Sequence, residues 1–213
     1  MDGTEVAVRA VESVGGDTVA LTLETPSEFE AAPGQFVQVG ATVGGEEVTR
    51  HYTLSSSDAT DTFEITVEVD PEGSLSPYLA DLDPGNTVEV AGPFGNAHYE
   101  GEPGVVVLGG GPGVGPAVGI GERALEDGGR VTVVYEDDDP AHEQRLTALA
   151  EAGGSVVVTD DVASDEVTEL LDDAEGQVFV YGFAEFLERA TAVLSGVDLD
   201  AGDAKTENFG PAP

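Results

Sequence analysis

The chain has 213 residues, which is enough for one large domain or two small ones. Its 43 Asp and Glu residues face seven Lys and Arg residues, and the formal net charge of -36 excludes a nucleic-acid binder, which needs clustered basic side chains. Cysteine is absent, so disulfides, thiolate-ligated metals and cysteine nucleophiles are excluded. No apolar run is long enough to span a membrane, and the N-terminus lacks the pattern of a secretory signal, so we expect a cytoplasmic protein.

The acidic residues are spread along the chain rather than gathered in one block. Because 40% of the residues are hydrophobic, a disordered acidic chain is excluded. We therefore expect a globular surface adapted to the molar salt of a halophilic cytoplasm, where screening suppresses self-repulsion. A basic protein partner is the alternative explanation of the charge.

The first half of the chain alternates apolar and polar residues, and turns interrupt it at short intervals. This period of two predicts strands over 6–11, 18–23, 35–39, 48–54, 63–69 and 87–90. One short helix is predicted over 76–82. Strands with this spacing favour an antiparallel barrel or sandwich, and we assign residues 1–100 to such an N-terminal domain.

The second half has continuous apolar runs, which are typical of strands buried on both faces of a parallel sheet. These runs predict strands over 105–108, 131–135, 155–158 and 178–181, and 205–209 is expected to add a last strand. Helical patterns lie between them, over 116–126, 141–152, 164–173 and 184–194. The alternation predicts a doubly wound α/β domain over residues 101–213.

A glycine-rich loop, residues 109–116, joins the first buried strand to the first helix of this second domain. Glycines let the backbone turn sharply, and amides at a helix N-terminus point toward an anion. Gly111, Gly113 and Pro116 give the spacing G-x-G-x-x-P, which differs from the G-x-G-x-x-G of the ordinary dinucleotide fold. The loop alone indicates either a phosphate site or a turn that requires small residues.

Arg50 stands near the end of a predicted strand, in the segment Arg50-His51-Tyr52-Thr53. A planar guanidinium suits bidentate contacts with phosphate, and Tyr52 offers an aromatic face. The alternative is a surface arginine paired with one of the many carboxylates. Arg145 and Arg189 lie within predicted helices, and we expect them to form ion pairs on the helix surfaces.

Taken in order, these motifs resemble the ferredoxin–NADP reductase superfamily, above all its compact two-domain members and the reductase domains of flavohaemoglobins. The segments that carry the resemblance are 33–37, 50–53, 73–79, 92–95, 111–116 and 207–209. The likeness covers nearly the whole chain. It implies an N-terminal barrel that binds FAD, with FMN as the alternative, and a C-terminal domain that binds a nicotinamide dinucleotide.

The resemblance also implies roles for individual residues of the flavin site. Arg50, with His51 beside it, would pair with the flavin phosphate, while Tyr52 would lie against the isoalloxazine ring and Thr53 near flavin N5. Backbone amides for the flavin phosphates would come from the start of the short helix, at Gly73, Ser74, Leu75 and Ser76.

On the nicotinamide side, the resemblance implies that a cradle for the dinucleotide is formed by Gly111, Pro112, Gly113, Val114 and Gly182. Glu207 and Phe209 match a terminal stretch that reaches the nicotinamide side of the flavin. The residues implied to be catalytic are Tyr52, Thr53 and Phe209. For Phe209 the alternative is an aromatic side chain that packs the end of the chain.

The sequence departs from the family pattern at three places. Tyr181-Gly182-Phe183 stands where relatives often have Cys-Gly-Pro, Pro112 and Gly115 replace hydroxyl or small apolar residues, and Glu68 stands where some relatives have a basic residue. The acidic loops at 136–139 and 159–161 favour the ribose hydroxyls of NADH over the 2′-phosphate of NADPH. Adaptation to salt would also make these loops acidic.

We therefore expect a flavin-dependent NAD(P)H oxidoreductase that passes hydride from NAD(P)H to FAD and electrons on to ferredoxin, a partner subunit or a small acceptor. One alternative is a non-catalytic flavin-binding sensor or electron-transfer subunit. Another is a flavin reductase that releases the reduced flavin. No metal site is expected, because the three histidines have no ligand spacing.

Overall fold

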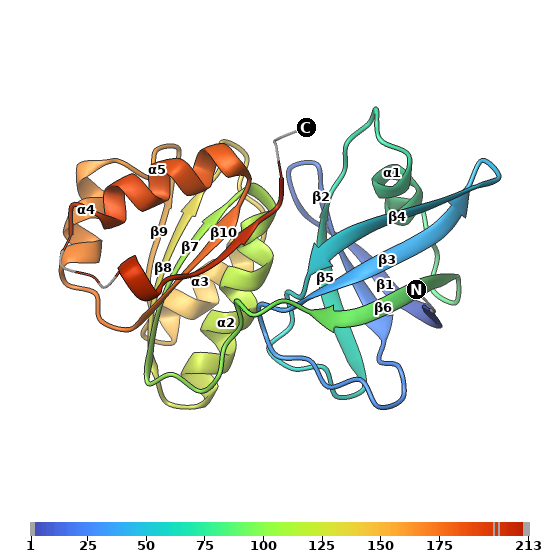
Figure 1. Ribbon diagram of the computed structural model, residues 1–213, viewed down its shortest axis with the longest axis horizontal. Coiled ribbons are helices and arrows are strands. Elements are labelled where there is room, and N and C mark those ends of the chain that lie inside the picture. Colours follow the sequence, from blue (N-terminus) through green and yellow to red (C-terminus); the bar gives the residue numbers. More distant parts are fainter. Residues whose placement is uncertain (1–2, 198, 200, 211–213) are drawn as a thin grey trace.

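The computed structural model describes residues 3–197, 199 and 201–210. In its N-terminal half, six antiparallel strands and one short helix follow one another along the chain (Figure 1). These elements are β1 (Thr4–Gly15), β2 (Thr18–Glu24), β3 (Phe36–Val43), β4 (Glu46–Thr53), β5 (Thr62–Glu68), α1 (Leu75–Ala80) and β6 (Thr87–Phe94).

The antiparallel sheet has the order β4-β3-β6-β1-β2-β5. Alternating residues of each strand turn inward, as Phe63, Ile65 and Val67 do from β5, and together they fill one hydrophobic core. A bridge between Leu54, which directly follows β4, and Ile65 in the middle of β5 connects the two outer strands. The sheet therefore curls toward a barrel, because its hydrophobic face can be buried only against itself and α1.

The C-terminal half is a parallel sheet of five strands, in the order β11-β10-β7-β8-β9, with helices on both faces (Figure 1). Its elements are β7 (Gly104–Gly110), the 3-10 turn η1 (Gly111–Gly113), α2 (Val114–Glu126), β8 (Arg130–Glu136), α3 (Glu143–Glu151), β9 (Ser155–Thr159), α4 (Asp165–Asp172), β10 (Gln177–Gly182), α5 (Ala184–Leu194), the 3-10 turn η2 (Ala201–Asp203) and β11 (Lys205–Asn208).

Strand β7 shows why these strands are apolar throughout. Val105 and Val107 face the core under α2 and α3, whereas Val106 and Leu108 face the core under α4 and α5. Because a strand turns successive side chains to opposite faces, a strand covered on both faces must be apolar at every position. This pattern places the glycine-rich end of β7 at the carboxyl edge of the sheet, where α2 begins.

The structure confirms the predicted fold class, an antiparallel N-terminal sheet followed by an α/β domain. Four of the five predicted helices differ at their ends, and α5 alone among them has the predicted bounds. The short helix runs over Leu75–Ala80 rather than 76–82, and α3 begins at Glu143 rather than 141. His142 has a φ of 56°, a left-handed conformation that cannot continue into a regular helix. The proposed division into 1–100 and 101–213 falls between β6 and β7, and its outermost residues lie outside the described ones.

Helix α2 brings the two halves into close contact through two glycines one turn apart. A Cβ at Gly115 would lie 2.8 Å from the Thr66 hydroxyl of β5, and one at Gly119 would lie 3.0 Å from the Ser55 carbonyl oxygen. Residues four apart share one face of a helix, so these glycines form a flat strip. Larger side chains there would force the two sheets apart.

The prediction that Arg145 forms an ion pair is confirmed, but its partners lie on other elements and its side chain is only 24% exposed rather than free on the surface of α3. Its guanidinium contacts Glu122 of α2 at 2.7 Å, Glu64 of β5 at 2.8 Å and the Ser55 carbonyl oxygen at 2.6 Å. Arg145 therefore ties the C-terminal half to the barrel. The sequence does not reveal this role, because both carboxylates come from elsewhere in the chain. Arg189 of α5 forms the expected exposed ion pair, with Glu136.

Among the helices that the structure describes, none is both long enough and apolar enough to cross a membrane.

Candidate functional site

A cavity of about 410 Å³ opens between the two halves, where the ends of β4 and β5 face the carboxyl edge of the parallel sheet. The barrel contributes most of its lining, and η1, the β10–α5 junction and β11 contribute the rest. The lining residues are Phe36, Arg50, His51, Tyr52, Thr53, Thr66, Glu68, Asp70, Pro112, Phe183, Glu207, Asn208 and Phe209.

Arg50 is the lining residue whose electrostatic situation is most unusual. Its guanidinium is exposed and donates to the carbonyl oxygen of its neighbour Thr49 at 2.8 Å. Within the described part of the chain, every other Arg and Lys side chain forms an ion pair with a carboxylate, and Arg50 forms none. In a chain with a net charge of -36, an unpaired cation beside a cavity is suited to an anionic ligand.

Tyr52 and His51 lie on opposite faces of β4. Tyr52 packs against the barrel core, and this burial raises the pKa of its hydroxyl to about 12, so the phenol stays neutral. The His51 ring meets the edge of Phe36, with ring centroids 5.4 Å apart. These residues give the barrel side of the cavity aromatic surfaces next to one positive charge.

Thr53 and Glu207 meet across the cavity from opposite halves of the chain. The Thr53 hydroxyl donates to Glu207 Oε1 at 3.2 Å, and Glu207 stands on β11, which pairs in parallel with β10. Burial raises the pKa of the Glu207 carboxyl to about 7, although the bond from Thr53 opposes the shift. A carboxyl with this pKa can hold or release a proton near neutral pH.

Phe209 and Phe183 form the aromatic wall on the side of the parallel sheet. Their rings meet edge to face, with centroids 6.0 Å apart. The Phe209 amide donates to the Gly182 carbonyl oxygen at 2.9 Å, which holds the end of β11 against β10. Phe209 therefore both packs the chain end and lines the cavity, so its two predicted roles are compatible.

The glycine loop stands beside this cavity, and its two main glycines serve different needs. Gly111 has a φ of 55°, and the nearest atoms to a Cβ there would be Glu68 Oε2 at 3.8 Å and the Phe183 ring at 4.0 Å. A Cβ at Gly113 would collide with the Tyr181 carbonyl oxygen of β10. Gly111 thus keeps open space beside Pro112, whereas Gly113 allows the turn to pack on the sheet.

The segment 73–76 lies outside the cavity lining. The Leu75 side chain is buried in the barrel core, so this predicted residue can offer a ligand only its backbone. The Ser76 hydroxyl accepts a hydrogen bond from the Asp70 amide at 3.1 Å, and this bond links α1 to the end of β5. Asp70 itself lines the cavity.

Glu68 and Asp70 make the rim of the cavity below β5 strongly acidic. Burial raises the pKa of Glu68, and the nearby carboxylates of Asp137, Asp70 and Asp17 raise it further. At the position of Glu68 the chain therefore presents a carboxyl with a weakened tendency to ionise. A nucleotide phosphate would be repelled from this rim and attracted to Arg50.

The cavity gathers seven of the predicted site residues, namely Arg50, His51, Tyr52, Thr53, Pro112, Glu207 and Phe209. It does not include Gly73, Ser74, Leu75, Ser76, Gly111, Gly113, Val114 or Gly182, and the roles predicted for these remain predictions. Six further lining residues were not predicted as site residues, namely Phe36, Thr66, Glu68, Asp70, Phe183 and Asn208. The alternation along β5 could have indicated Thr66, which lies on the same strand face as Glu68.

Residues 5–99, which contain the barrel and the Arg50 segment, match the family model of the oxidoreductase FAD-binding domain. This segment is an FAD-binding domain.

Curated relatives extend the likeness of the FAD-binding domain into the second half. NADH-cytochrome b5 reductase 1 of Laccaria bicolor is 31% identical over 160 residues, which are 68% of this chain and 51% of that protein. The glycine betaine monooxygenase reductase subunit of Pseudomonas aeruginosa is 27% identical over 222 residues, with 92% of this chain and 61% of that protein covered. The chain thus spans about half the length of the curated relatives it matches.

Solved structures share the complete fold. The flavohem-like FAD/NAD-binding domain of nitric oxide dioxygenase from Vibrio cholerae has a TM-score of 0.81 at 22% identity, over 99% of this chain and 100% of that one. A ferredoxin NADP+ reductase from Neisseria gonorrhoeae with bound FAD and NADP has a TM-score of 0.78 at 17% identity, over 98% of this chain and 99% of that one. The FAD-binding domain and the α/β domain are therefore arranged as in ferredoxin–NADP reductase.

Proposed function

We propose that this chain is a flavin-dependent NAD(P)H oxidoreductase, in which the cavity between the FAD-binding domain and the α/β domain is the site of electron transfer. The observation that carries this proposal is the unpaired Arg50 beside Tyr52 on the cavity lining of an FAD-binding domain. We also propose the division into a flavin domain over 1–100 and a nicotinamide-nucleotide domain over 101–213.

The residues at the cavity fit an FAD molecule in their chemistry. A flavin ring needs apolar faces, and the walls supply Tyr52, Phe183 and Phe209. A pyrophosphate needs a cation without a partner, and Arg50 supplies it. When bound there, FAD accepts a hydride from reduced nicotinamide and gives up the electrons singly or in pairs.

The residues of the chain would bind the flavin, orient its ring and hold or release a proton beside it. Arg50 would hold the flavin phosphate, and Tyr52 would support one face of the ring while Phe209 covers the nicotinamide side. Thr53 lines the cavity, and its hydroxyl donates a hydrogen bond to Glu207 Oε1. Because its pKa is about 7, the Glu207 carboxyl can store a proton there and release it as the charge at the site changes.

The loop Gly111, Pro112, Gly113 and Val114, together with Gly182, would hold the nicotinamide dinucleotide at the carboxyl edge of the parallel sheet, and the structure offers a reason to prefer NADH there. Carboxylates follow β8 at Glu136 and Asp137, and they would repel the 2′-phosphate of NADPH. They are also held in place, because Glu136 pairs with Arg189 and Asp137 accepts a bond from the Tyr135 hydroxyl at 2.9 Å.

The electron acceptor would be a separate redox centre. The chain has no cysteine, so it cannot hold a cysteine-ligated iron–sulfur cluster of its own. By their names, its relatives reduce cytochrome b5 or serve as electron-transfer components of oxygenases. We propose an acceptor of this kind, either a ferredoxin or a partner subunit.

The test is an anaerobic visible spectrum of the purified protein loaded with FAD in molar KCl, recorded before and after NADH and then NADPH. Bleaching of the protein-bound flavin band supports the reductase and gives the nucleotide preference. A bound band that neither nucleotide bleaches would instead support the non-catalytic flavin module. Release of free reduced flavin during turnover would support a flavin reductase. If the protein neither retains FAD nor reduces free flavin with NADH or NADPH, all three functions are refuted.

A further inference from the structure

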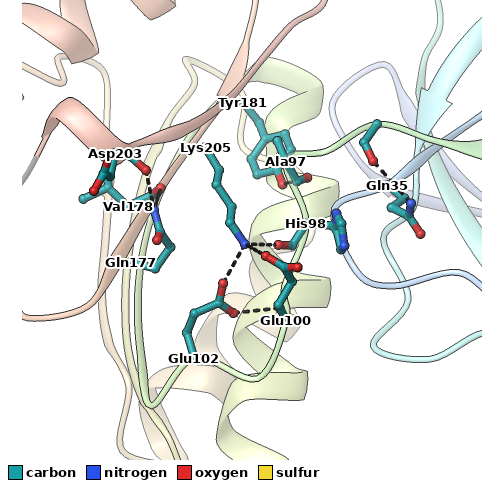
Figure 2. A network of polar contacts seen from close by, with 11 residues as sticks. Gln35, Ala97, His98, Glu100, Glu102, Gln177, Val178, Tyr181, Asp203 and Lys205 are labelled. Atoms are coloured by element: carbon teal, nitrogen blue, oxygen red, sulfur yellow. Dashed lines mark hydrogen bonds and ion pairs between the residues drawn. The ribbon is translucent and has the colours of Figure 1, made fainter.

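Lys205, the only lysine of the chain, lies at the start of the edge strand β11 and has all three of its ammonium donors engaged. Nζ donates to the His98 carbonyl oxygen at 2.8 Å, to Glu100 Oε2 at 2.6 Å and to Glu102 Oε1 at 2.7 Å (Figure 2). An ammonium has three donors and no acceptor, so this set leaves none unused. The side chain is 18% exposed, in a chain whose cations are mostly at the surface.

The acceptors of Lys205 all belong to the segment 95–103, which joins the two domains between β6 and β7. The same segment is held by a second bond, because the Tyr181 hydroxyl of β10 donates to the Ala97 carbonyl oxygen at 2.5 Å (Figure 2). The interdomain segment is thus tied to both of the last two strands of the parallel sheet.

Lys205 and Glu207 lie on the same face of β11, because side chains two positions apart on a strand point the same way. Their partners in register on β10 are Phe179 and Tyr181. The two rings are stacked with centroids 6.5 Å apart, and Lys205 Nζ lies 5.3 Å from the centre of the Phe179 ring. The four side chains therefore form one packed layer that connects the ammonium to the Glu207 position.

The interdomain segment also passes close to Glu207. A Cβ at Gly95, the first residue of the segment, would lie 3.5 Å from Glu207 Oε2, while Oε1 accepts the bond from Thr53. The segment accordingly runs close to the Glu207 carboxylate at its start and is bonded to β11 through the ammonium of Lys205 further along. If the bonds to Lys205 were lost, the neighbouring carboxylates of Glu100 and Glu102 would be left without the cation that they share.

We propose that Lys205 is a positioning residue, which clamps β11 to the interdomain segment and so holds the Glu207 carboxylate against Thr53 at the flavin cavity. A four-residue edge strand bonded on one side has few contacts of its own to fix its end. Without the clamp, β11 and the segment separate, water reaches Glu207, and the bond to Thr53 opens. The inference rests on the proposed function only for the role of the Glu207 proton at the flavin site. The positioning of Glu207 by Lys205 is independent of it.

The test follows the titration of the Glu207 carboxyl carbon by NMR in protein labelled with ¹³C-glutamate, without flavin or nucleotide. The signal is assigned by its loss in Glu207→Gln. Burial places the pKa of Glu207 at about 7 in the intact protein. Lys205→Met keeps the length and apolar stem of the side chain, and we expect it to lower the titration midpoint by at least one pH unit, toward the ordinary range of glutamate.

Two further variants separate positioning from general loss of charge or of stability. Arg130→Met removes one cation of an exposed ion pair with Glu175, and it is expected to leave the Glu207 midpoint unchanged. Lys205→Arg keeps the charge. We expect its Glu207 midpoint to fall by no more than half of the decrease seen in Lys205→Met. A Lys205→Met protein that is folded and keeps the intact midpoint would overturn the proposal, even if its melting temperature had fallen.

Should Lys205→Met fail to fold, Glu102→Gln decides the question, since it weakens the same clamp while keeping an oxygen acceptor for the ammonium. A downward shift of the midpoint in that variant supports the positioning role, and an unchanged midpoint overturns it. Because the readout needs neither cofactor, its outcome is independent of whether NADH or NADPH reduces bound flavin.

Discussion

The Thr53 hydroxyl donates a hydrogen bond to Glu207 Oε1 at 3.2 Å, and 154 positions of sequence separate the two residues. Thr53 ends a strand of the FAD-binding domain, whereas Glu207 stands on the last strand of the α/β domain. The bond therefore exists only when the two domains are docked. It makes the protonation of Glu207 depend on the arrangement of the domains as well as on local burial.

Glu207→Gln should stabilise the protein at alkaline pH. Burial raises the pKa of Glu207 from 4.5 to about 7, so the fold favours the protonated form, and that stabilisation is present below pH 4.5 and lost as pH rises through 7. Glutamine does not ionise, so the variant should exceed the parent by up to about 3 kcal/mol at pH 8 and match it near pH 4. Denaturant unfolding at both pH values measures this, with Glu12→Gln on an exposed position of β1 as control.

His142→Asn should make the free energy of unfolding less sensitive to mild acid. Burial, with a smaller contribution from Arg145, lowers the pKa of His142 from 6.5 to about 4. Stability from the neutral ring is complete above pH 6.5 and is lost as pH falls toward 4. Asparagine tolerates the left-handed backbone at this position. The gap in unfolding free energy between pH 8 and pH 5 should shrink in the variant, and an unchanged gap would contradict the assignment.

Arg50→Ala should weaken FAD binding by about ten- to a hundredfold, which corresponds to one charged hydrogen-bonding group. The guanidinium forms no ion pair within the described residues, so the melting temperature of the flavin-free protein should not change. Fluorescence titration with FAD measures the affinity. Arg130→Ala, which removes an exposed cation far from the cavity lining, should bind FAD like the parent.

Gly111→Ala and Gly113→Ala should have different effects although they stand two residues apart. At Gly111 the added methyl finds open space, and the left-handed backbone costs about 1–2 kcal/mol. At Gly113 it collides with the Tyr181 carbonyl oxygen, so the turn and β10 must separate. We expect Gly111→Ala to fold and to raise the KM for the nicotinamide nucleotide, and Gly113→Ala to lose much more stability. Equal melting temperatures would refute this distinction.

Arg145→Met should destabilise the docked domains by about 2–4 kcal/mol, because it leaves Glu64 and Glu122 without their shared cation. The loss should diminish in molar KCl, where the two carboxylates repel each other less. Arg123→Met breaks an exposed pair within α2 and should cost less than about 1 kcal/mol. Thermal unfolding at low and high KCl measures both changes.

Local patterns in the sequence were sufficient to predict the fold of both halves of the chain and part of the candidate site. The alternation of Phe63, Ile65 and Val67 predicts a half-buried strand, and the unbroken run at 105–108 predicts one buried on both faces. Both predictions hold because apolar side chains are buried in the fold, so their spacing along a strand shows whether one face or both faces are covered. Arg50 could be singled out because a cation is rare in this composition.

The roles of Arg145, Lys205 and the glycines of α2 were decided by the tertiary structure. In the sequence, Arg145 is a charged residue within a predicted helix, and Lys205 begins a short predicted strand. Neither pattern indicates which carboxylate the cation pairs with. Their partners lie 81–103 positions away, at Glu64 for Arg145 and at Glu102 for Lys205. Hydrogen bonds and ion pairs act over a few ångströms, so only the docking of two separately patterned domains determines which carboxylate each cation meets.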